Sequence, residues 1–201
     1  SELGKLKKSW EIIFVEDTSG DETKKTVEKL VVEIKNSHAI YHKKNEGRGK
    51  TVRDGILKAK GEICAFLDID LEVSEKYIPI FINEIENGYD MVIAKRFYEG
   101  NYKSLGRYAG SKLYAGIVKL ILNIPIEDTE AGYKFFRRSN ILPVIAKTHD
   151  NHWFWDTEIC AQACKFGLKI SQVPVIFKKR LEKVSTVKFI PDTIDYVKKL
   201  V

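Results

Sequence analysis

The sequence predicts an α/β fold with a mostly parallel, Rossmann-like central sheet and helices on both faces. Three observations support this prediction. Short apolar runs alternate with segments whose apolar residues recur at helical spacing, and Gly, Asp, Asn and Ser occupy the connections between them. The content of 44% hydrophobic and 31% charged residues is typical of globular proteins, and 201 residues suffice for one domain or one domain with a small appendage.

The first half of the chain shows the alternation most clearly. The apolar run EIIFV leads into an acidic turn, and the run ICAFL leads directly into Asp68-Ile69-Asp70. Ser74 is typical of a helix N-cap, whereas Gly61 and Gly88 are typical helix stops. The predicted strands are residues 11–15, 39–42, 63–67 and 91–94, and the predicted helices are residues 23–34, 47–60 and 74–87.

The second half is less regular. A helical pattern covers residues 104–122, and the strongly apolar stretch 113–126 is too short to cross a bilayer, so we expect a core helix or a membrane-interface segment. Strands are predicted at 133–136 and 169–177, with a helix at 156–166 that Asp156 caps and Gly167 stops. A basic amphipathic helix is expected at 189–201, after a main domain of residues 1–188.

Charge and cysteine content exclude several functional classes. The net charge of +6 comes from residues 165–201, which contain nine Lys or Arg and three Asp or Glu. Such a basic end suits phosphate groups or an anionic membrane surface, but aromatic residues are not interleaved with the lysines as nucleic-acid binding would require. Three cysteines predict no disulfide framework. Because the sequence also lacks an apolar run of about 20 residues and a secretory leader, we expect a soluble chain in a reducing compartment.

Charged residues follow the predicted strands. Ligands of parallel sheets bind beyond the carboxyl ends of the strands, and there the sequence places Glu16-Asp17, Asn45-Glu46, Asp68-Ile69-Asp70 and Lys95-Arg96. Asp68 and Asp70 are two residues apart, and Glu72 repeats the spacing. Oxygen ligands of this kind suit Mg²⁺ or Mn²⁺ bridging to a substrate phosphate. A solvated acidic turn is the alternative interpretation.

A glycine-rich helix start is a second candidate site. Gly47-Arg48-Gly49-Lys50-Thr51 resembles the end of a phosphate-binding P-loop, but position 44 is Lys where that motif needs Gly, which excludes a P-loop nucleotidase. The exposed amides of this helix start, with Arg48 and Lys50, remain candidates for phosphate or base contacts.

The order of the motifs resembles that of the family 2 glycosyltransferases, most closely their dolichyl- and polyprenyl-phosphate sugar transferase branch. The motifs are EIIFVEDTSGDET, NEGRGK, GEICAFLDIDLE, IAKRF, DTEAGYKFFRR, FWDTEI and VPVIFKKR. The resemblance implies a GT-A fold whose first strand and Pro-x-Tyr-Asn-Glu-like loop precede this chain. A Gly-x-Ser-Lys stretch frequent in the branch is absent, as is the Gln-x-x-Arg-Trp of processive synthases.

The resemblance also assigns roles to residues. It implies that Glu16 and Asp17 contact the nucleoside and that Asp68, Asp70 and Glu72 bind the metal. It further implies that Arg96 and Arg107 face the donor diphosphate or the acceptor phosphate, and that the segment containing Asp128 and Glu130 lies beside the acceptor.

The sequence therefore predicts a Mg²⁺- or Mn²⁺-dependent inverting glycosyltransferase. It would move a sugar from a UDP- or GDP-sugar to a polyprenyl or dolichyl phosphate. We expect the protein to bind peripherally at the cytoplasmic face of the membrane. A lipid phosphate needs no strong general base, whereas a sugar hydroxyl would need Asp128 or Glu130. The alternatives are transfer to a soluble or protein-bound glycan and a non-catalytic nucleotide-sugar binding module.

Overall fold

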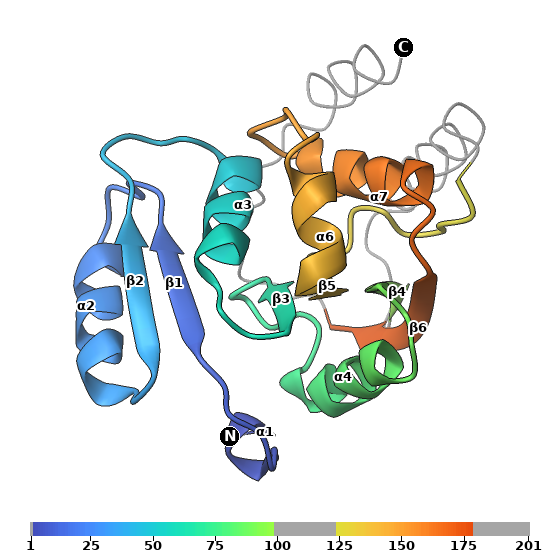
Figure 1. Ribbon diagram of the computed structural model, residues 1–201. Coiled ribbons are helices and arrows are strands. Elements are labelled where there is room, and N and C mark those ends of the chain that lie inside the picture. The colour runs from blue at the N-terminus through green and yellow to red at the C-terminus, as the bar shows by residue number, and fades with distance from the viewer. Residues whose placement is uncertain (1, 99–123, 179–201) are drawn as a thin grey trace.

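The computed structural model describes residues 2–98 and 124–178 of the chain. Arg107, the predicted helices at 104–122 and 189–201, and most of the apolar stretch 113–126 lie outside the described residues. The described part has two sheets side by side, with helices above and below the larger one (Figure 1).

The smaller sheet pairs two parallel strands, β1 (Ile12–Glu16) and β2 (Ser37–Tyr41). The helix between them, α2 (Thr23–Glu33), packs on both strands. The short helix α1 (Glu2–Lys5) precedes β1. The next helix, α3 (Arg48–Lys58), packs against β1 and also against β3 of the larger sheet, so it joins the two sheets.

The larger sheet has the strand order β3-β5-β4-β6. Three of its strands run in the same direction, whereas β5 (Tyr133–Arg137) is antiparallel to both of its neighbours. The prediction of a mostly parallel α/β sheet is therefore confirmed, with one antiparallel strand that periodicity alone does not reveal. The other three strands are β3 (Ile63–Leu67), β4 (Met91–Tyr98) and β6 (Ile170–Phe177).

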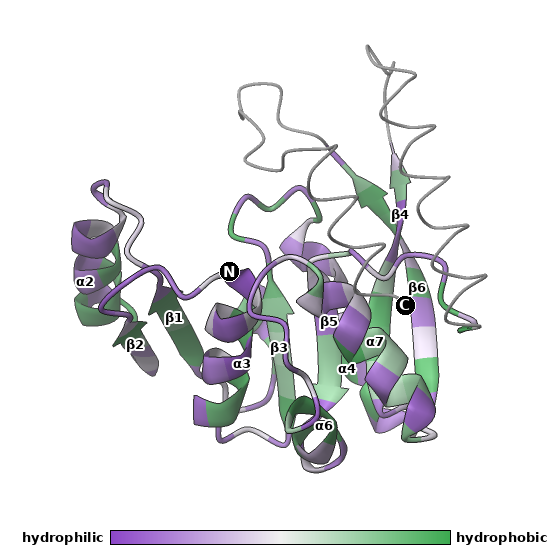
Figure 2. Ribbon diagram, turned by 90° about the horizontal axis from the view of Figure 1, so that it is seen from above, coloured by the Kyte–Doolittle hydropathy of each residue, from purple (hydrophilic) through white to green (hydrophobic). Residues whose placement is uncertain are grey.

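Helices cover both faces of the larger sheet, as predicted. Phe81 of α4 (Ile78–Glu86) packs on Tyr133 and Phe135, whose side chains point to one face of β5. The opposite face, where Phe66 meets Trp155, is covered by α6 (Arg138–Ile145) and α7 (Trp155–Lys165). Strands coloured mainly as hydrophobic lie between these helices in Figure 2.

Local signals place several helix ends correctly. Ser74 accepts a hydrogen bond from the Lys76 amide and so caps the 3₁₀ turn Glu75–Tyr77 that leads into α4. Gly88 and Gly167 follow helices with φ of +102° and +70°, a conformation that glycine adopts without strain. The helix α6 was missed, because Arg138 follows β5 with no connecting turn residues and Pro143 lies inside the helix.

The prediction that Asp156 caps a helix is wrong. Phe154 is the N-cap residue of α7, and Asp156 lies inside the first turn. Its side chain is buried and paired with Lys134 and Arg48. The sequence pattern could not show these partners, because one comes from β5 and the other from α3.

Candidate active site

The candidate site lies where β1, β2 and β3 end and β5 begins. Three contacts join these ends. The carboxylate of Asp17, directly after β1, accepts a hydrogen bond from the Gly47 amide at 2.8 Å. Arg48, the first residue of α3, reaches Asp68 directly after β3. The Asp68 amide in turn donates to the carbonyl of Gly132, just before β5.

Glu16 and Asp17 are both engaged in internal hydrogen bonds. The buried Glu16 carboxylate accepts bonds of 2.7 Å from the amide and the hydroxyl of Ser19, which lower its pKa. Burial works to raise the pKa of Asp17, but hydrogen bonds from the Glu46 amide, His42 and the Gly47 amide lower it overall. In the structure, therefore, this acidic turn fixes the loop that leads into α3.

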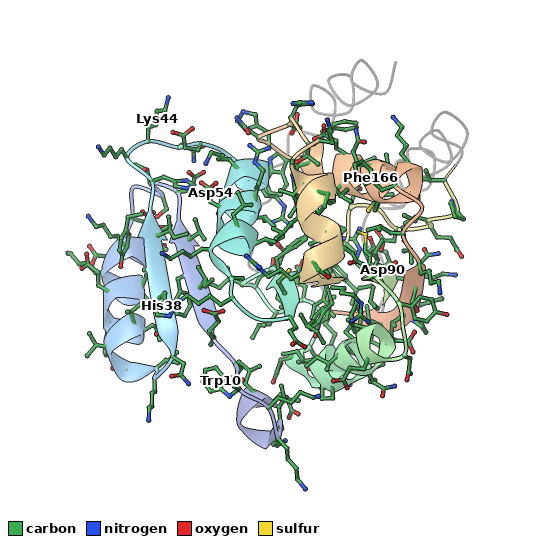
Figure 3. All side chains as sticks on the ribbon, in the orientation of Figure 1. Trp10, His38, Lys44, Asp54, Asp90 and Phe166 are labelled. Carbon is green, nitrogen blue, oxygen red and sulfur yellow. The ribbon has the colours of Figure 1, made fainter. Side chains whose placement is uncertain are left out.

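His42 links the acidic turn after β1 to helix α3. Its Nδ1 lies 2.6 Å from an Asp17 oxygen and its Nε2 lies 3.1 Å from an Asp54 oxygen. Asp54, labelled in Figure 3, also pairs with Lys50 one helical turn earlier. The imidazole is only 8% exposed. His42 was not among the predicted site residues, although a histidine at the end of a predicted strand is a usable signal.

The glycines at the start of α3 are explained by close packing. A Cβ at position 47 would lie 2.5 Å from Nδ1 of His152, and one at position 49 would lie 2.7 Å from the Asp150 carbonyl. Gly47 also has a φ of +92°. The Lys50 amide donates to the carbonyl of Asn151. The start of α3 is thus seated against the loop before α7.

Asp68 is held on two sides. One carboxylate oxygen accepts a 2.6 Å hydrogen bond from Arg48 Nη1. On the other side a Cβ at position 132 would lie 2.7 Å from Oδ1 and closer still to Oδ2, so a side chain there would displace this carboxylate. Burial raises the pKa of Asp68, and the Arg48 guanidinium offsets part of that effect.

Asp70 and Glu72 continue the acidic turn. Asp70 Oδ1 accepts a hydrogen bond from the Glu72 amide at 3.2 Å, and the Glu72 carbonyl accepts one from the Lys178 amide. Among the described residues, no group of three or more His, Cys, Asp or Glu side chains is arranged to hold a metal ion. Asp68, Asp70 and Glu72 therefore do not form a ready three-ligand cluster in this structure.

A second charged pair lies on β4 and the segment before β5. Arg96 donates to Asp128 from its backbone amide, Nε and Nη2 at 3.1, 2.7 and 2.7 Å. Both side chains are largely buried, at 16% and 17% exposed. The Arg96 guanidinium also lies over the rings of Tyr98 and Phe177. The Asp128 carboxylate is thus fully engaged with Arg96.

Glu130 is affected by two charged pairs, Arg96–Asp128 and Lys134–Asp156. Burial raises its pKa to about 7. A carboxyl group with this pKa can exchange a proton near neutral pH.

The family follows from comparison with known proteins. Residues 3–142 match the model of Glycosyl transferase family 2. The chain belongs to this family. The resemblance inferred from the order of the motifs is confirmed, and the fold agrees with it. A solved structure of glucosyl-3-phosphoglycerate synthase from Mycobacterium tuberculosis, with Mn²⁺, UDP and glucosyl-3-phosphoglycerate, superimposes with a TM-score of 0.71 at 14% identity, covering 94% of this chain and 67% of that one.

Curated relatives point to the same branch of family 2. The chain is 30% identical over 176 residues to dolichyl-phosphate beta-glucosyltransferase ALG5A of Trichomonas vaginalis, covering 83% of this chain and 54% of that protein. It is 28% identical over 170 residues to glycosyltransferase AglD of Haloferax volcanii, covering 83% of this chain and 27% of AglD. The chain thus spans about half or less of the length of these two relatives.

Of the described residues, no helix has both the length and the apolar character needed to span a membrane.

Proposed function

We propose that this family 2 glycosyltransferase domain transfers a sugar from a nucleoside diphosphate sugar to a polyprenyl or dolichyl phosphate. The observation that supports this most directly is the arrangement of charge at one sheet edge, where Asp68 and Asp70 follow β3 and the Arg96–Asp128 pair comes from β4 and the segment before β5. The name of the relative ALG5A, a dolichyl-phosphate beta-glucosyltransferase, supports the lipid-phosphate branch. We assign residues 1–188 to the catalytic domain and 189–201 to an amphipathic helix beside the membrane.

The acidic turn after β3 is chemically suited to a divalent cation. Carboxylate oxygens are the ligands that Mg²⁺ and Mn²⁺ prefer, and these ions complete their coordination with water and substrate phosphates, so a full protein cage is not required. In our proposal Asp68 and Asp70 hold the ion and Glu72 supports it. When bound, the ion would neutralise charge on the departing diphosphate.

The remaining donor contacts are proposed along the same edge. Glu16 and Asp17 order the loop that approaches the nucleoside. Arg48 and Lys50 at the start of α3 supply positive charge near the donor, and Arg107 supplies it from outside the described residues. The base could be uracil or guanine, and UDP is favoured because the M. tuberculosis enzyme with the same fold was solved with UDP.

The transfer step is an in-line displacement. A phosphate oxygen of the acceptor forms a bond to the anomeric carbon while the bond from that carbon to the diphosphate oxygen breaks, which inverts the configuration. The acceptor phosphate is already anionic near neutral pH and needs no strong base. Arg96, oriented by Asp128, contributes positioning and charge stabilisation. Glu130 would accept a proton only if the acceptor were a hydroxyl.

The reaction is tested with labelled UDP-glucose and GDP-mannose, dolichyl phosphate in mixed micelles and Mn²⁺. The proposal expects label in the butanol-extractable lipid, with loss of transfer on adding chelator or in the Asp70→Asn variant. A Glu130→Gln variant should keep transfer to the lipid phosphate. Label found solely in aqueous oligosaccharide would favour a glycan acceptor, and metal-dependent UDP binding without turnover would favour a binding module.

The proposed localisation at a membrane depends on the proposed lipid acceptor. A lipid-linked phosphate confines the reaction to a membrane surface, and the excess of Lys and Arg in residues 165–201 suits an anionic one. We propose peripheral binding at the cytoplasmic face.

A further inference from the structure

A fully buried lysine lies in the middle of the larger sheet. Lys134 of β5 is 0% exposed and stands in register with Phe66 of β3 and Ile93 of β4. Its Nζ donates 2.6 Å hydrogen bonds to the Ala131 carbonyl and to Asp156 Oδ1. Burying an ammonium group is costly, and well-packed apolar residues can often replace a buried ion pair without loss of stability. Folding alone therefore gives little reason for a charge here.

Asp156 connects this lysine to the candidate metal site. Its carboxylate is 5% exposed and accepts from Lys134 on Oδ1 and from Arg48 Nε, at 2.9 Å, on Oδ2. Arg48 uses Nη1 to bind Asp68. A continuous set of charged contacts thus runs from the interior of the sheet to the acidic turn after β3.

Arg48 is also confined by aromatic rings. Its guanidinium lies 5.6 Å from the centre of the Phe66 ring and 5.3 Å from that of Trp153. The Lys134 ammonium lies 5.1 Å from the same Phe66 ring. With its planar group held by rings and by two carboxylates, Arg48 presents one fixed edge to Asp68.

We infer that Lys134 and Asp156 are positioning residues that set the orientation of Asp68 through Arg48. Asp156 and Asp68 share the Arg48 guanidinium. Arg48 therefore orients the Asp68 carboxylate but does not fully neutralise its negative charge. Arg48 has one positive charge against two carboxylates, so Lys134 supplies the second positive charge and keeps the Asp156 carboxylate in place. Loss of Asp156 leaves Arg48 free to pair fully with Asp68, in competition with a bound cation. Loss of Lys134 instead leaves the buried Asp156 carboxylate to draw Arg48 away from Asp68, so that Asp68 loses its fixed orientation. The inference rests on the proposed function, because it concerns the residue proposed to hold the donor metal.

The test measures UDP binding by calorimetry with and without Mn²⁺, on the 201-residue chain. The variants are Asp156→Asn, which keeps the size of the side chain, and Lys134→Met, which removes the charge. Both should weaken Mn²⁺-dependent UDP binding by about 10- to 100-fold, as loss of outer partners of metal ligands typically does. The matched control is Asp90→Asn, which removes a carboxylate paired with Arg137 and Asn140 just before β4 (Figure 3). It should leave the affinity unchanged.

A mutant cycle separates positioning from general loss of stability. In an Asp68→Asn background, Asp156→Asn should change Mn²⁺-dependent UDP binding by less than about twofold, because residues acting through one group are non-additive. The melting temperatures of all variants are measured as well. If Lys134→Met does not fold, the near-isosteric Asp156→Asn variant alone tests the positioning role.

The outcomes are distinct. Wild-type affinity in folded Asp156→Asn and Lys134→Met overturns the positioning role and leaves the proposed function standing. Equal effects of Asp156→Asn in both backgrounds also overturn it. A wild-type chain that binds UDP with no response to Mn²⁺ contradicts the proposed metal site itself, and the inference with it.

Discussion

Gly132 lies directly against the carboxylate of Asp68, and the Asp68 amide donates to the Gly132 carbonyl at 2.9 Å. A methyl group at position 132 would overlap the carboxylate that we assign to the metal. The glycine of the DTEAGYK motif therefore has a physical role, because it leaves room for the side chain of Asp68, which directly follows β3.

The variant Gly132→Ala tests that relationship. The added Cβ must displace Asp68, so we expect an overpacking cost of about 1–3 kcal/mol in unfolding free energy and at least about tenfold weaker Mn²⁺-dependent UDP binding. Gly55→Ala is the control, because a Cβ there meets only Val15 Cγ2, at 3.3 Å. Unchanged metal-dependent binding in Gly132→Ala would contradict the role assigned to Asp68.

The Arg96–Asp128 pair should contribute strongly to stability as well as to transfer. Asp128→Asn removes the charge that three Arg96 donors share in a largely buried setting, and we expect a loss of about 2–4 kcal/mol by urea denaturation. Its neighbour Glu127 pairs with Lys95 but is 54% exposed, so Glu127→Gln should cost less than about 1 kcal/mol. Equal losses in the two variants would refute this account.

Glu130 should make stability depend on pH. Its pKa in the folded protein, about 7, is raised by burial above the ordinary value of 4.5, so ionisation destabilises the fold. The contribution of protonated Glu130 is fully present below about pH 4.5 and is lost as the pH rises through 7, by at most about 3 kcal/mol. Urea denaturation at pH 5 and pH 8 should show a smaller difference for Glu130→Gln than for wild type. The exposed Glu28→Gln should match wild type.

His42 should stabilise the loop between β2 and α3. Removing its imidazole leaves the carboxylates of Asp17 and Asp54 without a shared partner, and we expect His42→Ala to lose about 1–3 kcal/mol in unfolding free energy. His38 supplies a matched control, because its side chain is 53% exposed and its nearest carboxylate oxygen, on Glu11, is 3.9 Å away. His38→Ala should stay within about 0.5 kcal/mol of wild type. A similar loss in both variants would mean that the His42 contacts contribute nothing specific.

Much of this fold could be predicted from the pattern of apolar residues. The run MVIA is a buried strand and ICAFL a partly buried one, and the helical stripe through Phe81 and Ile85 packs on the sheet. The antiparallel direction of β5 could not be predicted, because an apolar run of this length carries no information about its partner strands.

The site could be predicted in part, because its position depends on where the strands end. Charged residues at strand ends are visible in the sequence, and the structure brings Asp17, Arg48 and Asp68 to one edge. The partners of those residues were not visible. Lys134 occurs in an otherwise apolar strand, YKFF, which was a usable signal, but its partner Asp156 is 22 positions away and resembled a helix cap.

The two separate sheets have a consequence for where a further strand can add to the described fold. Within residues 2–98 and 124–178, β1 pairs only with β2, and β3 pairs only with β5, so each of these apolar strands keeps one edge without a strand partner. Unpaired backbone amides and carbonyls along an apolar strand are a template for pairing with another chain. An extended segment added at either of these edges would form backbone hydrogen bonds with β1 or β3 and so extend the sheet.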